Sequence, residues 1–140
     1  MDYTNEMLLE FDSLSKNESF ARMVVAGFVA GLDPTVEEIA DIKTAVSEAV
    51  TNAIIHGYEE EKGKICINCK ISGQEIYIEI KDHGKGIEDI EKAMEPLYTT
   101  KPDMDRSGMG FSFMEAFMDD LEVESKLGVG TTVKMKKKIH

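Results

Sequence analysis

Two neighbouring runs of alternating apolar and polar residues constrain the fold of this chain more than any other feature. Every second residue of 65–71 is isoleucine or cysteine, and every second residue of 76–80 is isoleucine. Successive side chains point to opposite faces of a strand, and Ser72-Gly73 between the runs is a turn sequence, so the pattern predicts a β-hairpin. One more step of the same parity places Asp82 on the apolar face, where burying an acid is costly without hydrogen-bond donors.

The same alternation predicts three further strands. They cover residues 7–11, 121–125 and 131–136. In the last of them Thr131 shares the inward parity of Val133, so it faces the same interior as Asp82 if the two strands are neighbours. Lys134 and residues 136–138 are interpreted as a solvated strand face and tail that protect a sheet edge.

Apolar residues at helical spacing predict four helices. Their approximate ranges are 15–31, 35–57, 87–97 and 111–118. Capping-box sequences open the first two, at Ser15…Glu18 and Thr35…Glu38. The apolar stripe of the second helix consists of Val36, Ile39, Val46, Ala49, Val50 and Ala53. Periodicity alone interprets the polar side of the first helix as a solvated face, made of Asn17, Glu18, Ser19 and Arg22.

Glu48 and Asn52 lie four residues apart near the end of the second predicted helix, so they share one of its faces. Pairing an acid with a carboxamide, rather than with Lys or Arg, suits a site that holds a metal ion beside a base. Asn52 can give Mg²⁺ one oxygen while phosphates and waters fill the other positions. Glu48 can then take a proton from an attacking hydroxyl or water. The alternative is a polar helix face that only meets water.

Asp82 and the glycines that follow it predict the base-binding end of a nucleotide site. Asp82 can accept hydrogen bonds from an exocyclic amine, and Thr131 can add a hydroxyl. Gly84 and Gly86 let a backbone approach a flat ring closely. The alternative is that Asp82-His83-Gly84 is an ordinary solvated turn at a strand end.

Residues 96–107 and the glycines after them predict the phosphate-binding end. The segment is rich in proline, hydroxyl and cationic residues, which is typical of a lid or binding loop. Gly108-Met109-Gly110 precedes a helix whose exposed amides favour phosphate, although packing or a turn explains these glycines equally well. Lys101 and Arg106, which come before the glycines, can hold an anionic tail.

Charge and composition exclude several classes of protein. The net charge of −11 argues against nucleic-acid binding, which needs clustered Lys and Arg. No apolar run approaches the roughly 20 residues of a membrane span, and the first residues lack the features of a signal peptide. Cys66 and Cys69 have opposite strand parity, so neither a disulfide nor a shared zinc is expected. We expect one domain in a reducing cytoplasm.

These segments resemble the sequence boxes of the GHKL superfamily of ATP-binding proteins. Glu48–Asn52 is similar to its N box, Asp82–Gly86 and Gly108–Gly110 to its two glycine boxes, and Gly130-Thr131 to its closing G-T, in matching order. No Walker A sequence is present, so a P-loop site is excluded. The resemblance implies an α/β (α+β) single domain over residues 1–140. Its expected architecture is a two-layer Bergerat-fold sandwich, with a mixed, mostly antiparallel sheet, helices on one face and a mobile ATP lid.

Within the superfamily the chain resembles the sporulation anti-sigma kinases of endospore-forming bacteria. The residues that carry this resemblance are 17–22, 47–58, 96–101 and 106–111. It implies a cytoplasmic, homodimeric protein-serine kinase that sequesters a sporulation sigma factor. Such a kinase also phosphorylates a serine of an anti-anti-sigma antagonist.

The resemblance also implies roles for individual residues. Glu48 would be the base toward the substrate serine, Asn52 the Mg²⁺ ligand, and Arg22 a contact for protein partners. The implied ATP- and ADP-binding residues are Asn52, Asp82, Gly84, Gly86, Thr99, Lys101, Arg106, Ser107, Gly108, Met109, Gly110 and Thr131.

Two other functions remain open. One is a nucleotide-gated anti-sigma binding module without turnover, for which Glu48 would be unnecessary. The other is the stress-response anti-sigma kinase of the same family, with different partners.

His83 and Lys85 depart from the small or acidic residues common in the first glycine box. His56 is interpreted as a structural residue at a helix end rather than as a phosphoacceptor.

Overall fold

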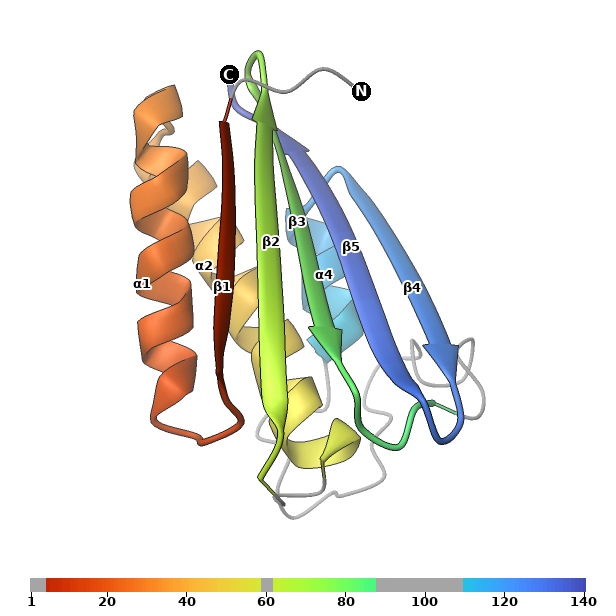
Figure 1. Cartoon of the computed structure of the whole chain (residues 1–140). Coiled ribbons are helices and arrows are strands. Elements are labelled where there is room, and N and C mark those ends of the chain that lie inside the picture. The colour runs from red at the N-terminus through yellow and green to blue at the C-terminus, as the bar shows by residue number, and fades with distance from the viewer. Residues whose placement is uncertain (1–4, 59–61, 88–109) are drawn as a thin grey trace.

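The computed structural model describes residues 5–58, 62–87 and 110–140 of the chain (Figure 1). Five strands form one sheet in the order β1-β2-β3-β5-β4, and every described pair is antiparallel. The strands are β1 (Asn5–Asp12), β2 (Lys64–Ser72), β3 (Glu75–Asp82), β4 (Asp120–Lys126) and β5 (Gly130–Lys138). The predicted hairpin is β2–β3, and the three other predicted strands are also confirmed.

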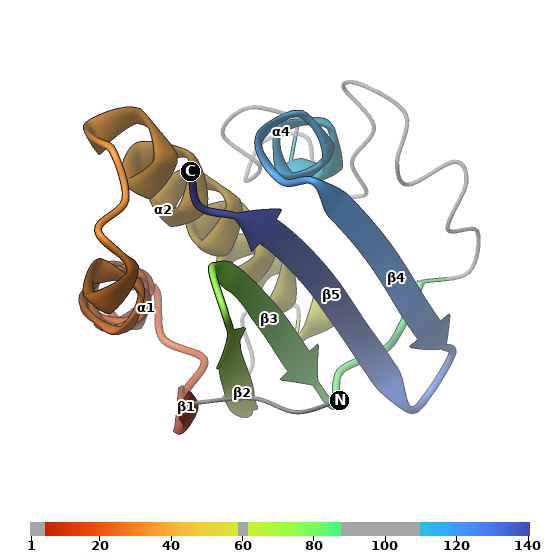
Figure 2. The same ribbon diagram turned by 90° about the horizontal axis from the view of Figure 1, so that it is seen from above.

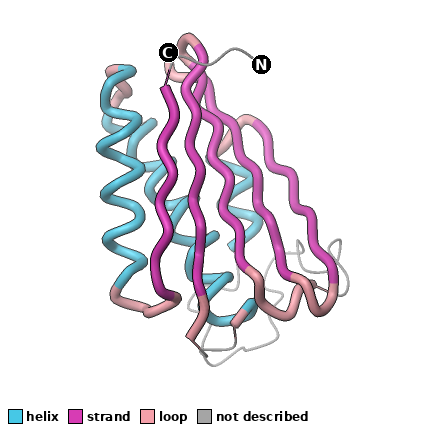
Figure 3. The backbone as a smooth tube through the Cα atoms, viewed as in Figure 1, coloured by secondary structure: helices cyan, strands magenta, loops and turns pink. Residues whose placement is uncertain are grey.

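Helices cover one face of this sheet. They are α1 (Asn17–Val29), α2 (Val36–Asn52) and α4 (Gly110–Phe117), with short helical segments η1 (Ala30–Leu32) and η2 (Ala53–Gly57). Seen from above, α1 lies beside β1, α4 lies on the β4 side, and α2 lies between them (Figure 2). Figure 3 shows the same two layers, with the strands in magenta and the helices in cyan. The expected two-layer α+β sandwich is confirmed, but the sheet is antiparallel throughout its described strands rather than mixed.

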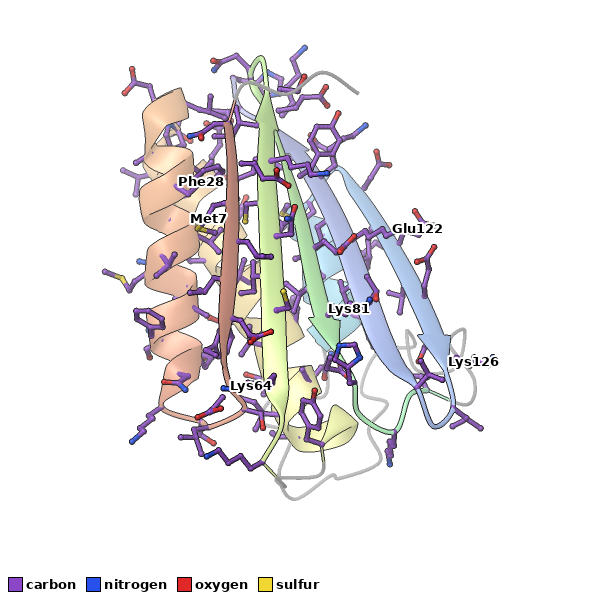
Figure 4. All side chains as sticks on the ribbon, viewed as in Figure 1. Met7, Phe28, Lys64, Lys81, Glu122 and Lys126 are labelled. Carbon is purple, nitrogen blue, oxygen red and sulfur yellow. The ribbon has the colours of Figure 1, made fainter. Side chains whose placement is uncertain are left out.

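The core lies between the sheet and the helices. Alternate residues of β2 and β3 are buried, as the hairpin pattern predicts, and so are the inward residues of α2. Met7 of β1 and Phe28 of α1, both labelled in Figure 4, pack against this core from the edge of the sandwich. The other sheet face carries charge, including Lys81. Cys69 is buried and Cys66 is half-buried on the open face, which is the opposite-face arrangement predicted from parity.

The two predicted capping boxes have different outcomes. At α2 the Thr35 hydroxyl accepts from Glu38 N–H at 3.0 Å, and Thr35 N–H donates to the Glu38 carboxylate at 2.9 Å. At α1 the capping box is wrong, since the N-cap is Lys16 and no side chain caps the helix. Turn hydrogen bonds replace the cap there, with Glu18 N–H donating to the Ser15 carbonyl at 3.2 Å. Local turn hydrogen bonds therefore place the N-cap one residue later than predicted, at Lys16.

Four further expectations about individual side chains are corrected. Val36, the first residue of α2, is 86% exposed rather than part of the stripe, whose contact with the core begins at Ile39. Ile42, which the predicted stripe omits, is fully buried. Glu18 on the polar side of α1 is buried rather than solvated. Lys137 points inward, where its ammonium donates to the Phe117 carbonyl at 2.7 Å and so caps α4. The lysines of β5 do not protect a sheet edge, because β5 lies between β3 and β4.

The remaining expectations concern the other predicted helices and membrane-spanning segments. The predicted helix at 87–97 lies outside the described residues. The second predicted helix ends at Gly57, as expected, although its last turn is a π-helix. Within the described ranges, no helix is long and apolar enough to cross a membrane.

Candidate functional site

Three elements meet at one end of the sandwich, the lower end in Figure 1: η2 after α2, the end of β3, and the start of β5. In the β3–β5 register Asp82 lies directly opposite Thr131. Both side chains are buried. The predicted neighbour relation between Asp82 and Thr131 is therefore confirmed, and Glu48 and Asn52 belong to the helix that ends at the same place.

The Asp82 carboxyl is 6% exposed and receives backbone hydrogen bonds. Gly84 N–H donates to its Oδ1 at 2.8 Å, and Thr131 N–H also donates to it. Burial raises the pKa of Asp82 above its usual value, while the two backbone donors and nearby His83 oppose this effect. A carboxylate has about four acceptor positions, so acceptor capacity remains for a ligand that donates hydrogen bonds.

The glycines beside Asp82 are explained by contacts within the protein. A Cβ on Gly84 would lie 2.1 Å from the Gly57 carbonyl oxygen, which also accepts from Lys85 N–H at 2.8 Å. A Cβ on Gly57 would lie 3.0 Å from Asp82 Oδ1. The loop after β3 therefore packs backbone to backbone on the end of η2, and this contact places Gly57 against the carboxyl of Asp82.

Two further glycines make similarly close approaches. Gly86 has φ +81°, and a Cβ there would lie 2.3 Å from the Lys126 carbonyl oxygen. Gly130 has φ +137°, and a Cβ there would lie 2.1 Å from the Asp82 carbonyl oxygen. From the sequence alone, Gly84 and Gly86 are explained by close approach of the backbone to a ligand. Contacts within the protein are enough to require both of these glycines. Their place in nucleotide binding stays a prediction.

Replacing Gly84 by alanine is expected to destabilise the fold by about 1–3 kcal/mol, because the added Cβ meets the backbone of Gly57 and the loop must move. The matched control is Gly27→Ala in α1, where nothing lies within 4 Å of an added Cβ. That change should be neutral or stabilising, by up to about 1 kcal/mol. Chemical denaturation of both variants measures the difference. Equal free energies of unfolding for Gly84→Ala and the unaltered chain would contradict the contact with Gly57.

A network of hydroxyl groups supports Thr131 from β4. Ser125 Oγ lies 2.8 Å from Thr131 Oγ1 and donates to the Gly130 carbonyl at 3.1 Å. It also accepts from Ile87 N–H at 2.7 Å. The sequence interpretation missed Ser125. Its inward parity, after Leu121 and Val123, was the available signal, because a polar residue at an inward position needs partners.

Tyr58 is a second residue that sequence reasoning missed. Its hydroxyl donates to the Lys64 carbonyl and accepts from His83 N–H at 2.8 Å. The ring lies against Gly63, where an added Cβ would be 2.3 Å from a ring carbon. Tyr58 therefore joins the segment after η2 to β2 and to the residue beside Asp82.

Glu48 and Asn52 are half-buried on the last turns of α2, and Asn52 is its final α-helical residue. The Asn52 Nδ2 is buried and has no hydrogen-bond partner among the described residues. Buried amide groups are normally paired, so the Nδ2 of this carboxamide has a hydrogen-bond donor to spare. The π-helical turn begins at the next residue, and such turns are frequent at functional sites. A ligand set of one carboxamide oxygen suits Mg²⁺ better than zinc.

The remaining predicted site residues are those of the phosphate-binding segment, most of which lie outside the described part of the chain, and Arg22 on α1. Thr99, Lys101, Arg106, Ser107, Gly108 and Met109 lie outside them, and Gly110 is described only as the first residue of α4. Arg22 is on α1, with its guanidinium 3.7 Å from the Glu18 carboxylate and its side chain 41% exposed. Among the described residues, no group of three or more His, Cys, Asp or Glu side chains is placed to hold a metal ion.

Comparison with known proteins gives consistent matches over nearly the whole chain. Residues 13–137 match the model of the histidine kinase-like ATPase domain. The chain is 66% identical to the anti-sigma F factor of a Thermoanaerobacter species, over 99% of this chain and 97% of that protein. It is 63% identical to the anti-sigma F factor of Clostridium botulinum, with the same coverage.

A solved structure shares the fold at low sequence identity. It contains the RsbU and RsbW domains of a Mycobacterium tuberculosis protein, and it superposes with a TM-score of 0.69 at 21% identity. The match covers 97% of this chain and 32% of the other, so this chain corresponds to about a third of that protein.

Proposed function

Because the chain belongs to the anti-sigma F factor family of histidine kinase-like ATPase domains, we propose that it is an ATP-dependent protein-serine kinase that also sequesters a sporulation sigma factor. It inactivates an anti-anti-sigma antagonist by phosphorylating one of its serines. One observation carries this proposal. The buried Asp82 carboxyl lies opposite Thr131, at the end of the sheet where the helix bearing Glu48 and Asn52 also ends.

The base of ATP or ADP is bound at Asp82 in this proposal. The carboxylate accepts hydrogen bonds from the exocyclic amine of adenine, and Thr131 contributes its hydroxyl. Gly84 and Gly86 line the same loop and bring its backbone close to the ring. Support comes from the burial of Asp82, since a hydrogen bond to a buried charged group contributes more than one in water.

The phosphates and Mg²⁺ are bound nearer Asn52. Asn52 is proposed as the protein ligand of the ion through its Oδ1, because it is the last residue of α2 and lies one helical turn after Glu48. Mg²⁺ would supply charge neutralisation on the phosphate oxygens. The residues proposed to hold the phosphates are Thr99, Lys101, Arg106, Ser107, Gly108, Met109 and Gly110.

Glu48 is the proposed catalytic base. Its carboxylate takes the proton of the substrate serine hydroxyl as the serine oxygen bonds to the terminal phosphorus and ADP leaves. Phosphoryl transfer depends mainly on positioning and charge neutralisation, so one base and one metal ligand four residues apart on a rigid helix are enough protein machinery. Both residues belong to the continuous α2, which supports a fixed separation.

The proposed partners are a sporulation sigma factor and the anti-anti-sigma protein, both met by a cytoplasmic homodimer of this chain. Arg22 on α1 is proposed as a contact for them, because its guanidinium is partly exposed and is held by Glu18 from the preceding turn. The net charge of −11 favours a partner with a basic surface.

The proposal is tested by incubating the purified chain with ATP labelled on its terminal phosphate, Mg²⁺ and an anti-anti-sigma protein. We expect label on a serine of the second protein, and none when the acceptor serine is replaced by alanine. ATP binding without any transfer would instead favour a nucleotide-gated binding module. Label on a histidine of this chain would replace the proposal with a histidine kinase.

A further inference from the structure

Ser125 is fully engaged in hydrogen bonding on three sides. Its Oγ accepts from Ile87 N–H at 2.7 Å, donates to the Gly130 carbonyl at 3.1 Å, and lies 2.8 Å from Thr131 Oγ1. The side chain joins β4 to the end of the loop after β3 and to the start of β5. It does so immediately beside the Asp82–Thr131 pair.

The hydrogens of this network can be assigned by counting. A serine hydroxyl has one hydrogen to donate and two lone pairs to accept with. The Ser125 hydrogen is directed to the Gly130 carbonyl, and one lone pair accepts from Ile87 N–H. The remaining lone pair faces Thr131 Oγ1, so the Thr131 hydroxyl is the donor in that contact. Thr131 then has only lone pairs to offer to any other group.

The orientation of Thr131 matters because of its neighbour. Asp82 lies opposite it in the register and, as a carboxylate, offers only acceptor positions. The two side chains therefore present acceptors alone. A purine with an amino group at position 6 presents hydrogens there, whereas a 6-oxo purine presents an acceptor. An acceptor facing acceptors leaves buried polar groups unpaired, which is the strongest form of discrimination that a binding site has.

From this network we propose that Ser125 is a specificity-determining positioning residue: it holds the Thr131 hydroxyl turned away from the ligand, so that the site accepts 6-amino purine nucleotides and rejects 6-oxo ones. The inference rests on the proposed function, in which Asp82 and Thr131 bind the base. Without Ser125, the Thr131 hydroxyl is free to rotate and donate to a 6-oxo group.

The experiment compares the affinities of the full chain for ATP and GTP by calorimetric titration. In the Ser125→Ala variant the preference for ATP over GTP is expected to fall about tenfold, which corresponds to one misplaced hydrogen bond. The control is Thr132→Ala, which removes a hydroxyl from the next residue of β5, a half-buried side chain of opposite strand parity. Its preference should equal that of the unaltered chain.

A double-mutant cycle separates this role from a general loss of packing. If Ser125 acts through Thr131, Ser125→Ala changes the ATP-to-GTP ratio in the unaltered chain but not in a Thr131→Val background. Ser125→Cys, with a similar shape and a weak donor and acceptor, replaces the alanine variant if the latter does not fold. An unchanged ratio in a folded Ser125 variant overturns the inference alone. Failure of the unaltered chain to bind ATP overturns the proposed function as well.

Discussion

The Glu48→Gln variant is expected to phosphorylate the anti-anti-sigma protein at least about 100-fold more slowly than the unaltered chain, the usual loss when a positioned base is removed. Glutamine has nearly the same shape as glutamate, but it cannot take a proton from the serine hydroxyl. Since Glu48 lies on α2 and the proposed base contacts lie on β3 and β5, ATP affinity should change by less than about threefold. Single-turnover transfer of labelled phosphate measures the first quantity, and titration measures the second.

Glu37→Gln provides the control for this experiment, because Glu37 is an exposed acid on the first turn of the same helix. It removes the same charge from the same element at the opposite end. Transfer by this variant should match that of the unaltered chain. If the two variants transferred phosphate at the same rate, Glu48 would have no role as a base and the binding-module function would be favoured.

Replacing Asp82 by asparagine is expected to weaken ATP binding by about 10-fold to 100-fold, in line with the loss of hydrogen bonds to a charged acceptor. The amide nitrogen of asparagine would also face the amine of adenine, donor against donor. Titration with ATP or ADP checks this expectation. Unchanged affinity would remove Asp82 from the base-binding role, whatever happens to the activity.

The same variant is expected to be at least as stable as the unaltered chain at neutral pH. Burial raises the pKa of Asp82 in the folded state above the unfolded value of 3.8. A raised pKa means that its contribution to stability is fully present below the unfolded pKa and is lost as pH rises through the folded pKa. At neutral pH the buried charge is therefore a net cost, and asparagine removes it while Oδ1 still accepts from Gly84 N–H.

Denaturation of both proteins between about pH 3 and pH 7 separates the two effects of Asp82. The free energy of unfolding of the unaltered chain should fall relative to that of Asp82→Asn as the pH rises through the folded pKa of Asp82. A variant that is less stable than the unaltered chain at every pH would mean that the carboxylate stabilises the fold, against the direction given by its burial.

Strand parity was enough to predict the central part of this site. It places Asp82 inward from the isoleucines of β3, and Thr131 inward from Val133, and the register of β3 and β5 then brings the two together. Strand parity predicts which face of the sheet a side chain lies on, but not which atoms it contacts there. The contacts of Ser125 with Ile87, of Tyr58 with His83 and of Lys137 with Phe117 join segments 20 or more residues apart, and no local pattern encodes them.

Helix-capping and helical-spacing rules failed where turn hydrogen bonds or the extent of neighbouring elements decide the structure. The sequence Ser15…Glu18 satisfies the capping box, but turn hydrogen bonds within residues 14–18 begin the helix at a different residue. Val36 has the right spacing for the α2 stripe, yet it lies beyond the part of the helix that is covered. The spacing of apolar residues identifies the apolar face of a helix. How much of that face is buried depends on where the neighbouring helices and strands end.

The backbone contacts of Gly84 and Gly130 bear on how sequence motifs are used to infer activity. Each glycine is required because another part of the protein backbone occupies the space of its side chain. A descendant of such a chain that had lost its nucleotide would still be selected to keep both glycines, simply to fold. Gly84 and Gly130 thus diagnose the architecture. Asp82, Asn52 and Glu48, which are proposed to bind the ligand and perform the chemistry, are the positions at which loss of either would first become visible in a sequence.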